Sequence, residues 1–154
     1  MRGQRFARRC IIPAIYLVVV GAVLFLGLLA GAGQADIASD RAVAMNRIRN
    51  SFRVLVTMAQ AGTFDAAAVQ SSAYEIVADL IIFKGMFPAG AQNSDRLSRP
   101  EIWTDRAGFD AAWEAGDSAA SKLGTVSDAD AYVPALQTLA AACRGCHKKY
   151  IMPQ

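Results

Sequence analysis

The chain contains few of the side chains from which metal sites are usually built. Its 154 residues include one histidine, His147, and three cysteines, Cys10, Cys143 and Cys146. A structural zinc site normally needs four cysteine or histidine ligands. Cys10 lies in a segment of a quite different kind from the other two cysteines, so these side chains do not make up a zinc site.

The chain also lacks a basic excess outside its first residues. The formal net charge is +3, but Arg2, Arg5, Arg8 and Arg9 precede a stretch, residues 10–35, that has no charged residue. Beyond that stretch there are 12 basic and 13 acidic side chains. A nucleic-acid-binding domain usually shows a basic face or stripe. We therefore expect no nucleic-acid partner.

An apolar run of 20 residues, 11–30, follows the four arginines. Basic residues before an apolar core fit a secretory signal peptide or a membrane helix. The length favours a retained helical anchor, since a span needs about 20 residues. Ala30-Gly31-Ala32, in contrast, fits a small-x-small cleavage site. Both alternatives divide the chain into a signal peptide or membrane anchor, 1–35, and a domain, 36–154. Both place that domain in the periplasm, tethered to the inner membrane if residues 11–30 are retained.

The sequence Cys143-Arg144-Gly145-Cys146-His147 is the attachment signature of a c-type haem. On a helix, residues i and i+3 share a face, so both sulfurs can reach one edge of a porphyrin. His147 can then supply a proximal nitrogen to iron. The alternatives are a structural disulfide, a redox CxxC motif or half of a zinc site. A redox CxxC usually accompanies a βαβ pattern, and this sequence shows none. The motif predicts one covalently bound haem c.

The rest of the chain predicts four amphipathic helices. In the first, over 37–61, apolar residues recur at helical spacing: Met45, Ile48, Phe52, Leu55 and Ala59. Thr63 is the expected cap of a second helix that ends before Gly85. The third helix is expected over 105–123, and the fourth begins at a cap, Ser127 or Asp128, and runs to about Tyr150. The prediction is an all-α, antiparallel four-helix bundle, preceded by the N-terminal apolar helix. The long connection, 85–105, is expected to be ordered and functional or to wrap a ligand.

A four-helix bundle with CxxCH on its last helix resembles the cytochrome c′ and cytochrome c-556 family, the class II c-type cytochromes. The likeness covers about residues 36 to 151. Besides the haem motif, three segments are similar to those of the family: Arg99 to Asp105 followed by Phe109, Phe87 to Gly90, and Arg41 followed by Met45.

The resemblance implies a role for each matching residue. Cys143 and Cys146 would form the thioethers, and His147 would be the proximal iron ligand. Arg41 would lie near a haem propionate, and Met45 would face the distal side of the iron. Members often carry a basic residue four positions after the histidine, where this chain has Ile151. Members also often form homodimers through their first two helices.

Two functions follow from the two states open to Met45. If its sulfur binds iron, the protein carries single electrons to and from redox partner proteins. If it only packs, the iron is five-coordinate and can bind nitric oxide or carbon monoxide. Met58 and Met86 are weaker candidates for the sixth ligand. An enzyme is not expected, because the only histidine is committed to iron and no acid–base pair is evident.

Two other features of the sequence, a lysine pair and a tryptophan, each have two possible roles. The first is the lysine pair Lys148 and Lys149, which fits the cationic end of a helix or a docking patch for an acidic redox partner. The second is Trp103, which would shield the haem edge, anchor the long connection, or do both. A third function, a structural haem subunit of a larger membrane complex, has only the apolar segment to suggest it.

Overall fold

The computed structural model describes residues 37–92 and 95–152. The predictions for residues 1–35, including the apolar segment 11–30, lie outside the described residues. Four long helices and one short helix make up the described chain. They are residues 37–60 (called helix 37–60), α2 (Ala66–Lys84), α3 (Glu101–Thr104), α4 (Arg106–Leu123) and α5 (Ala129–Tyr150).

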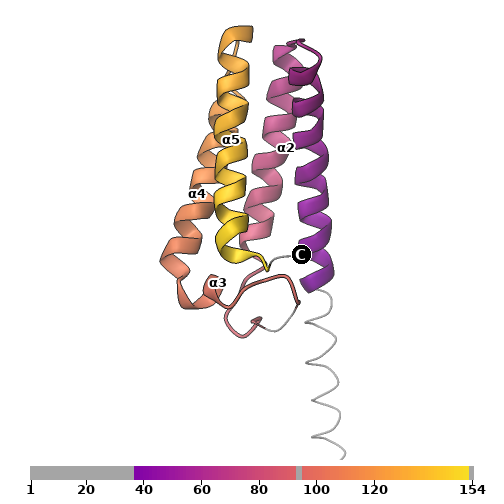
Figure 1. Cartoon of the computed structure of the whole chain (residues 1–154). Coiled ribbons are helices and arrows are strands. Elements are labelled where there is room, and N and C mark those ends of the chain that lie inside the picture. Colours follow the sequence, from indigo (N-terminus) through magenta and orange to yellow (C-terminus); the bar gives the residue numbers. More distant parts are fainter. Residues whose placement is uncertain (1–36, 93–94, 153–154) are drawn as a thin grey trace, which may run out of the picture.

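The four long helices stand side by side as an antiparallel bundle (Figure 1). Side-chain contacts between neighbouring helices show that these helices run antiparallel to each other. Arg47 and Ser51 of helix 37–60 contact Asp79 and Glu75 of α2, in reverse order along the chain. The hydroxyl of Tyr132, near the start of α5, donates to the carbonyl of Leu55 near the end of helix 37–60 (2.5 Å). The predicted four-helix bundle is confirmed, and α3 is an addition that the sequence did not indicate.

The caps of the helices show where local sequence reasoning succeeded and where it failed. Thr63 was expected to cap the second helix, and this was wrong. Its hydroxyl donates back to the carbonyl of Met58 (3.3 Å), and Asp65 is the N-cap of α2. The carboxylate of Asp65 accepts from two backbone amides of the first turn, which an aspartate satisfies well. Asp128 caps α5, as one of the two predicted alternatives, and Asp105 caps α4.

The core consists of two clusters of buried side chains. The first cluster fills the bundle around Leu55, Ile76 and Leu139. The second cluster lies beside the connection between α2 and α4 and contains one buried residue from each of the five helices and one from the connection: Ala44, Phe83, Phe87, Ile102, Phe109 and Tyr150. The predicted stripe of the first helix points into this core, with Ile48 and Leu55 buried and the other members partly buried.

The connection between α2 and α4 is tied to the end of α5. Ser98 and Ile151 form an antiparallel bridge, the amide of Arg99 donates to the carbonyl of Tyr150 (3.0 Å), and that of Met152 donates to Leu97 (2.8 Å). The connection therefore packs against the helical turns that carry the cysteine motif.

The helix α2 would suit a membrane span by length and hydropathy, alone among the helices of the described chain. Its contacts place it in the bundle. Asp79 pairs with Arg47 of helix 37–60, and its Leu80 carbonyl accepts from Trp113 of α4 (2.8 Å). Trp113 is half-buried, and the ammonium of Lys84 lies 4.1 Å from the centre of its ring.

Candidate haem-attachment site

The cysteine motif occupies the last turns of α5. Cys143 and Cys146 lie three residues apart on one helix, both partly buried, and their thiols are not joined in a disulfide. Burial raises the pKa of both thiols, that of Cys146 to about 11. Both therefore stay protonated near neutral pH, whereas a reactive redox cysteine is a thiolate of lowered pKa. No group of three or more potential metal ligands exists among residues 37–92 and 95–152.

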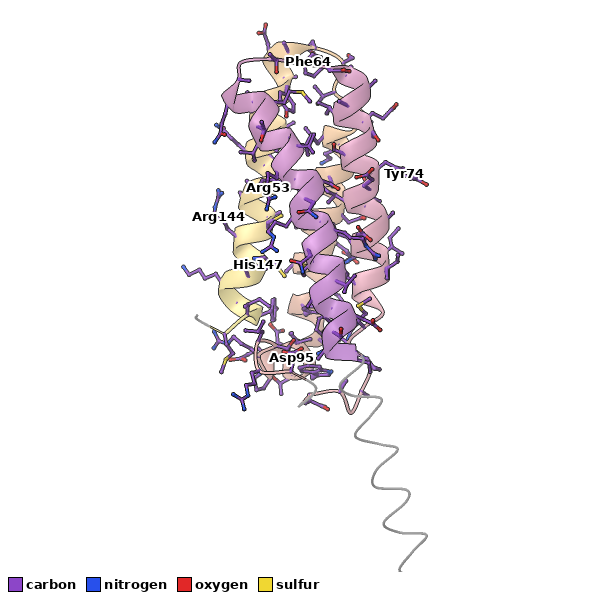
Figure 2. All side chains as sticks on the ribbon, turned by 90° about the vertical axis from the view of Figure 1, so that its right-hand side faces the viewer. Arg53, Phe64, Tyr74, Asp95, Arg144 and His147 are labelled. Atoms are coloured by element: carbon purple, nitrogen blue, oxygen red, sulfur yellow. The ribbon has the colours of Figure 1, made fainter. Side chains whose placement is uncertain are left out.

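His147 follows the second cysteine and is exposed at the surface of α5. Nearby protein atoms displace part of its hydration and lower the pKa of the imidazole. The neutral imidazole is the form that binds a metal. In Figure 2 His147 lies on the side of α5 that is turned toward helix 37–60.

A shallow apolar groove lies between α5 and helix 37–60. Its volume is about 310 Å³, and it is lined by side chains from both helices: Phe52, Val56, Ala59, Gln60, Val133, Leu136, Gln137 and Ala140. Ala140 precedes His147 by two helical turns, so both residues lie on the same side of α5. The groove therefore runs along α5 toward the cysteine motif.

Met45 lies where the two core clusters meet. It is partly buried and packs against both clusters, whereas Cys143 packs against the first and Cys146 against the second. Met45, from the first helix, thus packs against both of the clusters that the two cysteines of the last helix border. Met58 packs against the first cluster alone, and Met86 against the second alone.

Arg41 is buried beneath the connection and is only 4% exposed. Its Nε and Nη2 donate to the carbonyl of Met86 (3.0 and 2.6 Å), and its Nη1 donates to a carboxylate oxygen of Asp95 (2.6 Å). The guanidinium lies 4.1 Å from the centre of the Phe87 ring. The resemblance predicted a haem propionate beside Arg41, and this stays a prediction. In the structure the carboxylate beside Arg41 is that of Asp95.

Asp95 is a residue of this site that the sequence did not single out. Its second carboxylate oxygen, Oδ1, accepts from the amides of Leu97 and Ser98 (2.8 and 2.5 Å). Burial raises the pKa of Asp95, but the hydrogen bonds from Ser98 and Arg41 outweigh burial and hold the pKa below its usual range. Asp95 therefore fastens the connection to helix 37–60. The two partners are 54 residues apart in the chain, and no local pattern marks such a pair.

Trp103 anchors the connection. Its indole nitrogen donates to the carbonyl of Pro88 (3.0 Å), and its ring lies 5.9 Å from that of Phe87. Of the two lysines after His147, Lys149 pairs with Asp105, and Lys148 has no ion-pair partner in the described part of the chain.

These observations fit a covalently attached haem. Two thiols on one helical face, an imidazole that follows them directly and an apolar groove on the same side of α5 supply the attachment points, the proximal ligand and the apolar surroundings of a c-type haem. The raised thiol pKa values do not fit a reactive redox dithiol, and the described residues place no group of three potential ligands together as a zinc site would need.

Comparison with known proteins gives consistent matches. A family model described as Cytochrome C' matches residues 36–150. Cytochrome c' of Rubrivivax gelatinosus is 29% identical over 120 residues, which are 75% of this chain and 93% of that protein. Its crystal structure matches with a TM-score of 0.69 and 27% identity, covering 77% of this chain and 97% of that chain. Cytochrome c prime from Shewanella frigidimarina has a TM-score of 0.69 and 27% identity, covering 78% and 97% of the two chains.

A structure of lower identity shares the fold. It is the nitric oxide complex of a mutant of cytochrome c prime from Alcaligenes xylosoxidans, with a TM-score of 0.71 and 22% identity. The match covers 79% of this chain and 97% of that chain.

Proposed function

Because the chain belongs to the cytochrome c′ family, whose members carry a covalently attached haem c, we propose that it carries single electrons through one such haem. Cys143 and Cys146 would form the two thioethers, and His147 would be the proximal ligand. When bound, the haem supplies an iron that cycles between the ferric and ferrous states. The protein tunes this iron through its axial ligands, hydrogen bonds and burial.

The observation that carries the electron-transfer proposal is the position of Met45. It lies at the junction of the two core clusters, one of which includes Cys143 and the other Cys146. A thioether as the second axial ligand gives a six-coordinate, low-spin iron with a raised potential, which suits electron transfer. Neither Met58 nor Met86 reaches both clusters, so Met45 is the better candidate for the sixth ligand.

An absorption spectrum of the ferric and ferrous holoprotein tests this assignment. We expect low-spin spectra with a methionine-to-iron charge-transfer band in the ferric state. Met45→Ala should abolish that band, whereas the matched variants Met58→Ala and Met86→Ala should retain it. A high-spin ferrous spectrum of the unaltered protein, or a band that survives in Met45→Ala, would refute Met45 as the ligand.

A second function, the binding of nitric oxide or carbon monoxide, has its own support. Met45 is packed among apolar side chains, and a thioether held in this way can leave the distal face open to a diatomic ligand. A protein of the same fold, a mutant of cytochrome c prime from Alcaligenes xylosoxidans, has a solved structure as a nitric oxide complex. Under this alternative the ferrous protein is high-spin, and adding carbon monoxide changes its spectrum without competition from Met45. With Met45 ligated, carbon monoxide binds only as the thioether leaves, so Met45→Ala binds it more tightly.

We propose that Arg41 stabilises the haem propionate on the side of the connection. The support is its nearly complete burial and its pairing with Asp95, which show that this region of the bundle holds a guanidinium against a carboxylate. A planar guanidinium has five donors and can serve more than one acceptor. Arg41→Lys should therefore lower the affinity for haem before attachment and shift the reduction potential.

We propose a homodimer through helix 37–60 and α2. These two helices carry most of the large apolar side chains that are exposed in the described chain: Val43, Val54, Tyr74, Ile81 and Ile82. Tyr74 alone is 74% exposed. Covering such a patch in a dimer removes apolar area from water. Sedimentation of the holoprotein should show a dimer that Ile81→Asp weakens.

We also propose a periplasmic location, with residues 1–35 as a signal peptide or inner-membrane anchor. The four arginines and the apolar run support targeting, and covalent haem attachment suits that compartment. Mass measurement of the mature protein in soluble and membrane fractions distinguishes cleavage from anchoring. A larger membrane complex would appear as co-purifying subunits.

A further inference from the structure

The charges of the bundle are unevenly distributed among its helices. Helix 37–60 and α5 together carry seven basic side chains and two acidic ones, Asp40 and Asp130. The other pair, α2 and α4, carries three basic side chains and five acidic ones. The side of the bundle that includes the cysteine motif is therefore strongly cationic, although residues 36–154 as a whole are close to neutral.

Three of the seven cations are neutralised by carboxylates elsewhere in the fold. Arg41 pairs with Asp95, Arg47 with Asp79 and Lys149 with Asp105. The other four are exposed and form no ion pair within the described residues: Arg49, Arg53, Arg144 and Lys148. We call these four residues the cationic rim.

The cationic rim borders the candidate haem site. Arg49 and Arg53 lie one turn apart on helix 37–60, next to groove residues of that helix. Arg144 lies one turn beyond the groove residue Ala140 of α5, and Lys148 directly follows His147. Figure 2 shows Arg53 and Arg144 on the two helices that border the groove, with His147 on the same side.

We propose that the cationic rim is a docking surface for the acidic face of a redox partner protein. This inference rests on the proposed electron-carrying function and names the surface at which the exchange takes place. Unpaired charges on a shared face raise the association rate with a surface of opposite sign and orient the encounter. Here they would bring an acidic partner to the side of the molecule where His147 is exposed.

An acidic protein fits this surface better than an anionic membrane. Helices that lie on membranes combine cations with large apolar side chains that enter the lipid. Of the eight large exposed apolar side chains of the described chain, three lie on α2, and the two helices that carry the rim contribute only three valines, Val43, Val54 and Val133. The cationic rim therefore places charged side chains around a groove but lacks the large apolar side chains that would enter a lipid surface.

Paramagnetic mapping of the holoprotein tests the surface without relying on electron transfer. The probe is hexacyanochromate(III), a redox-inert trianion, added to the reduced protein under carbon monoxide so that the haem is diamagnetic. We expect it to broaden amide signals of residues 49–53 and 144–148. Arg53→Glu and Arg144→Glu should each reduce the broadening about threefold, and added salt should remove it. Lys122→Glu, at an exposed site on α4, makes the same change in net charge and should leave the pattern unaltered.

Two results would overturn the proposal. The first is broadening that is uniform, or that Lys122→Glu reduces as much as Arg53→Glu does. The second is binding of the full-length holoprotein to phosphatidylglycerol vesicles that Arg53→Glu and Arg144→Glu weaken and Lys122→Glu does not, because the rim would then face a membrane. The optical spectrum reports separately whether Met45 binds iron. Failure of the electron-carrying proposal can therefore be told apart from failure of the docking proposal.

Discussion

The ammonium of Lys149 lies 2.5 Å from the carboxylate oxygen Oδ2 of Asp105. The same oxygen accepts from the hydroxyl of Tyr150 (3.1 Å), and the other carboxylate oxygen accepts from the amide of Gly108 at the start of α4 (3.2 Å). One carboxylate therefore caps α4 and holds the last turn of α5, the turn that also contains His147. Hydrogen bonds from Lys149 and Tyr150 lower the pKa of Asp105.

Replacing Asp105 should separate its two roles. Asp105→Ala loses both the cap and the contacts with α5, whereas Asp105→Asn keeps an oxygen for the cap and loses the charge opposite Lys149. We expect the melting temperature to fall most for Asp105→Ala and less for Asp105→Asn. Asp128→Ala is the control, because it removes only the cap of α5, a single hydrogen bond. If Asp128→Ala lowers the melting temperature as much as Asp105→Ala, the contacts with α5 contribute nothing.

Asp95 should make stability depend on pH in the acid range. Its pKa in the folded protein is lowered, so its carboxylate binds protons less readily there than in the unfolded chain. The resulting stabilisation is fully present above the unfolded value of about 3.9 and is lost as the pH falls through the lower folded pKa. Asp95→Asn should therefore destabilise the protein near neutral pH and flatten the decline below about pH 4.

The measurement is the melting temperature of the holoprotein between acid and neutral pH. Asp130→Asn is the matched control, because Asp130 is exposed and contacts no cation among the described residues. Parallel curves for the unaltered protein and Asp95→Asn would show that the Arg41 pair does not contribute.

The contacts of Asp95 and Asp105 also show why only part of this site could be predicted. Helical spacing was enough to predict four helices, because apolar residues such as Ile48 and Leu55, seven positions apart, recur with the period that buries one face of a helix. The cysteine motif was evident because its ligands are adjacent in sequence. Arg41 and Asp95, however, are 54 residues apart, and they meet only because the connection folds back over the start of helix 37–60.

The wrong prediction of the cap of the second helix has a different, local cause. Thr63 and Asp65 are both good capping residues within three positions, and propensity alone does not choose between them. The choice is made by Gly62, whose φ of +65° ends the preceding helix and turns the chain so that Asp65 is extended. Met45 could be placed near the thiols only through the family resemblance, because a methionine on an apolar stripe is usually packing.

Tyr132 should contribute one buried hydrogen bond to the free energy of unfolding. Its side chain is 1% exposed and its hydroxyl donates to the carbonyl of Leu55, which joins α5 to helix 37–60. Tyr132→Phe leaves that carbonyl without this donor and should cost about 1 kcal/mol in denaturant unfolding. Tyr74→Phe, at a residue 74% exposed, should cost nothing measurable. Equal effects at the two positions would contradict the role of the hydroxyl.

Two glycines should respond in opposite directions to the same substitution. Gly62 has a φ of +65° and nothing within 4 Å of a Cβ atom, so Gly62→Ala meets no clash but forces alanine into the left-handed region. The expected cost is about 1 kcal/mol. Gly145 lies within α5 and also has open space around a Cβ atom, so Gly145→Ala should stabilise the helix by about 0.5–1 kcal/mol. Denaturant unfolding of both variants, with the haem content of each confirmed by its absorbance, checks the pair. A stabilised Gly62→Ala would show that the turn after helix 37–60 does not need the left-handed conformation.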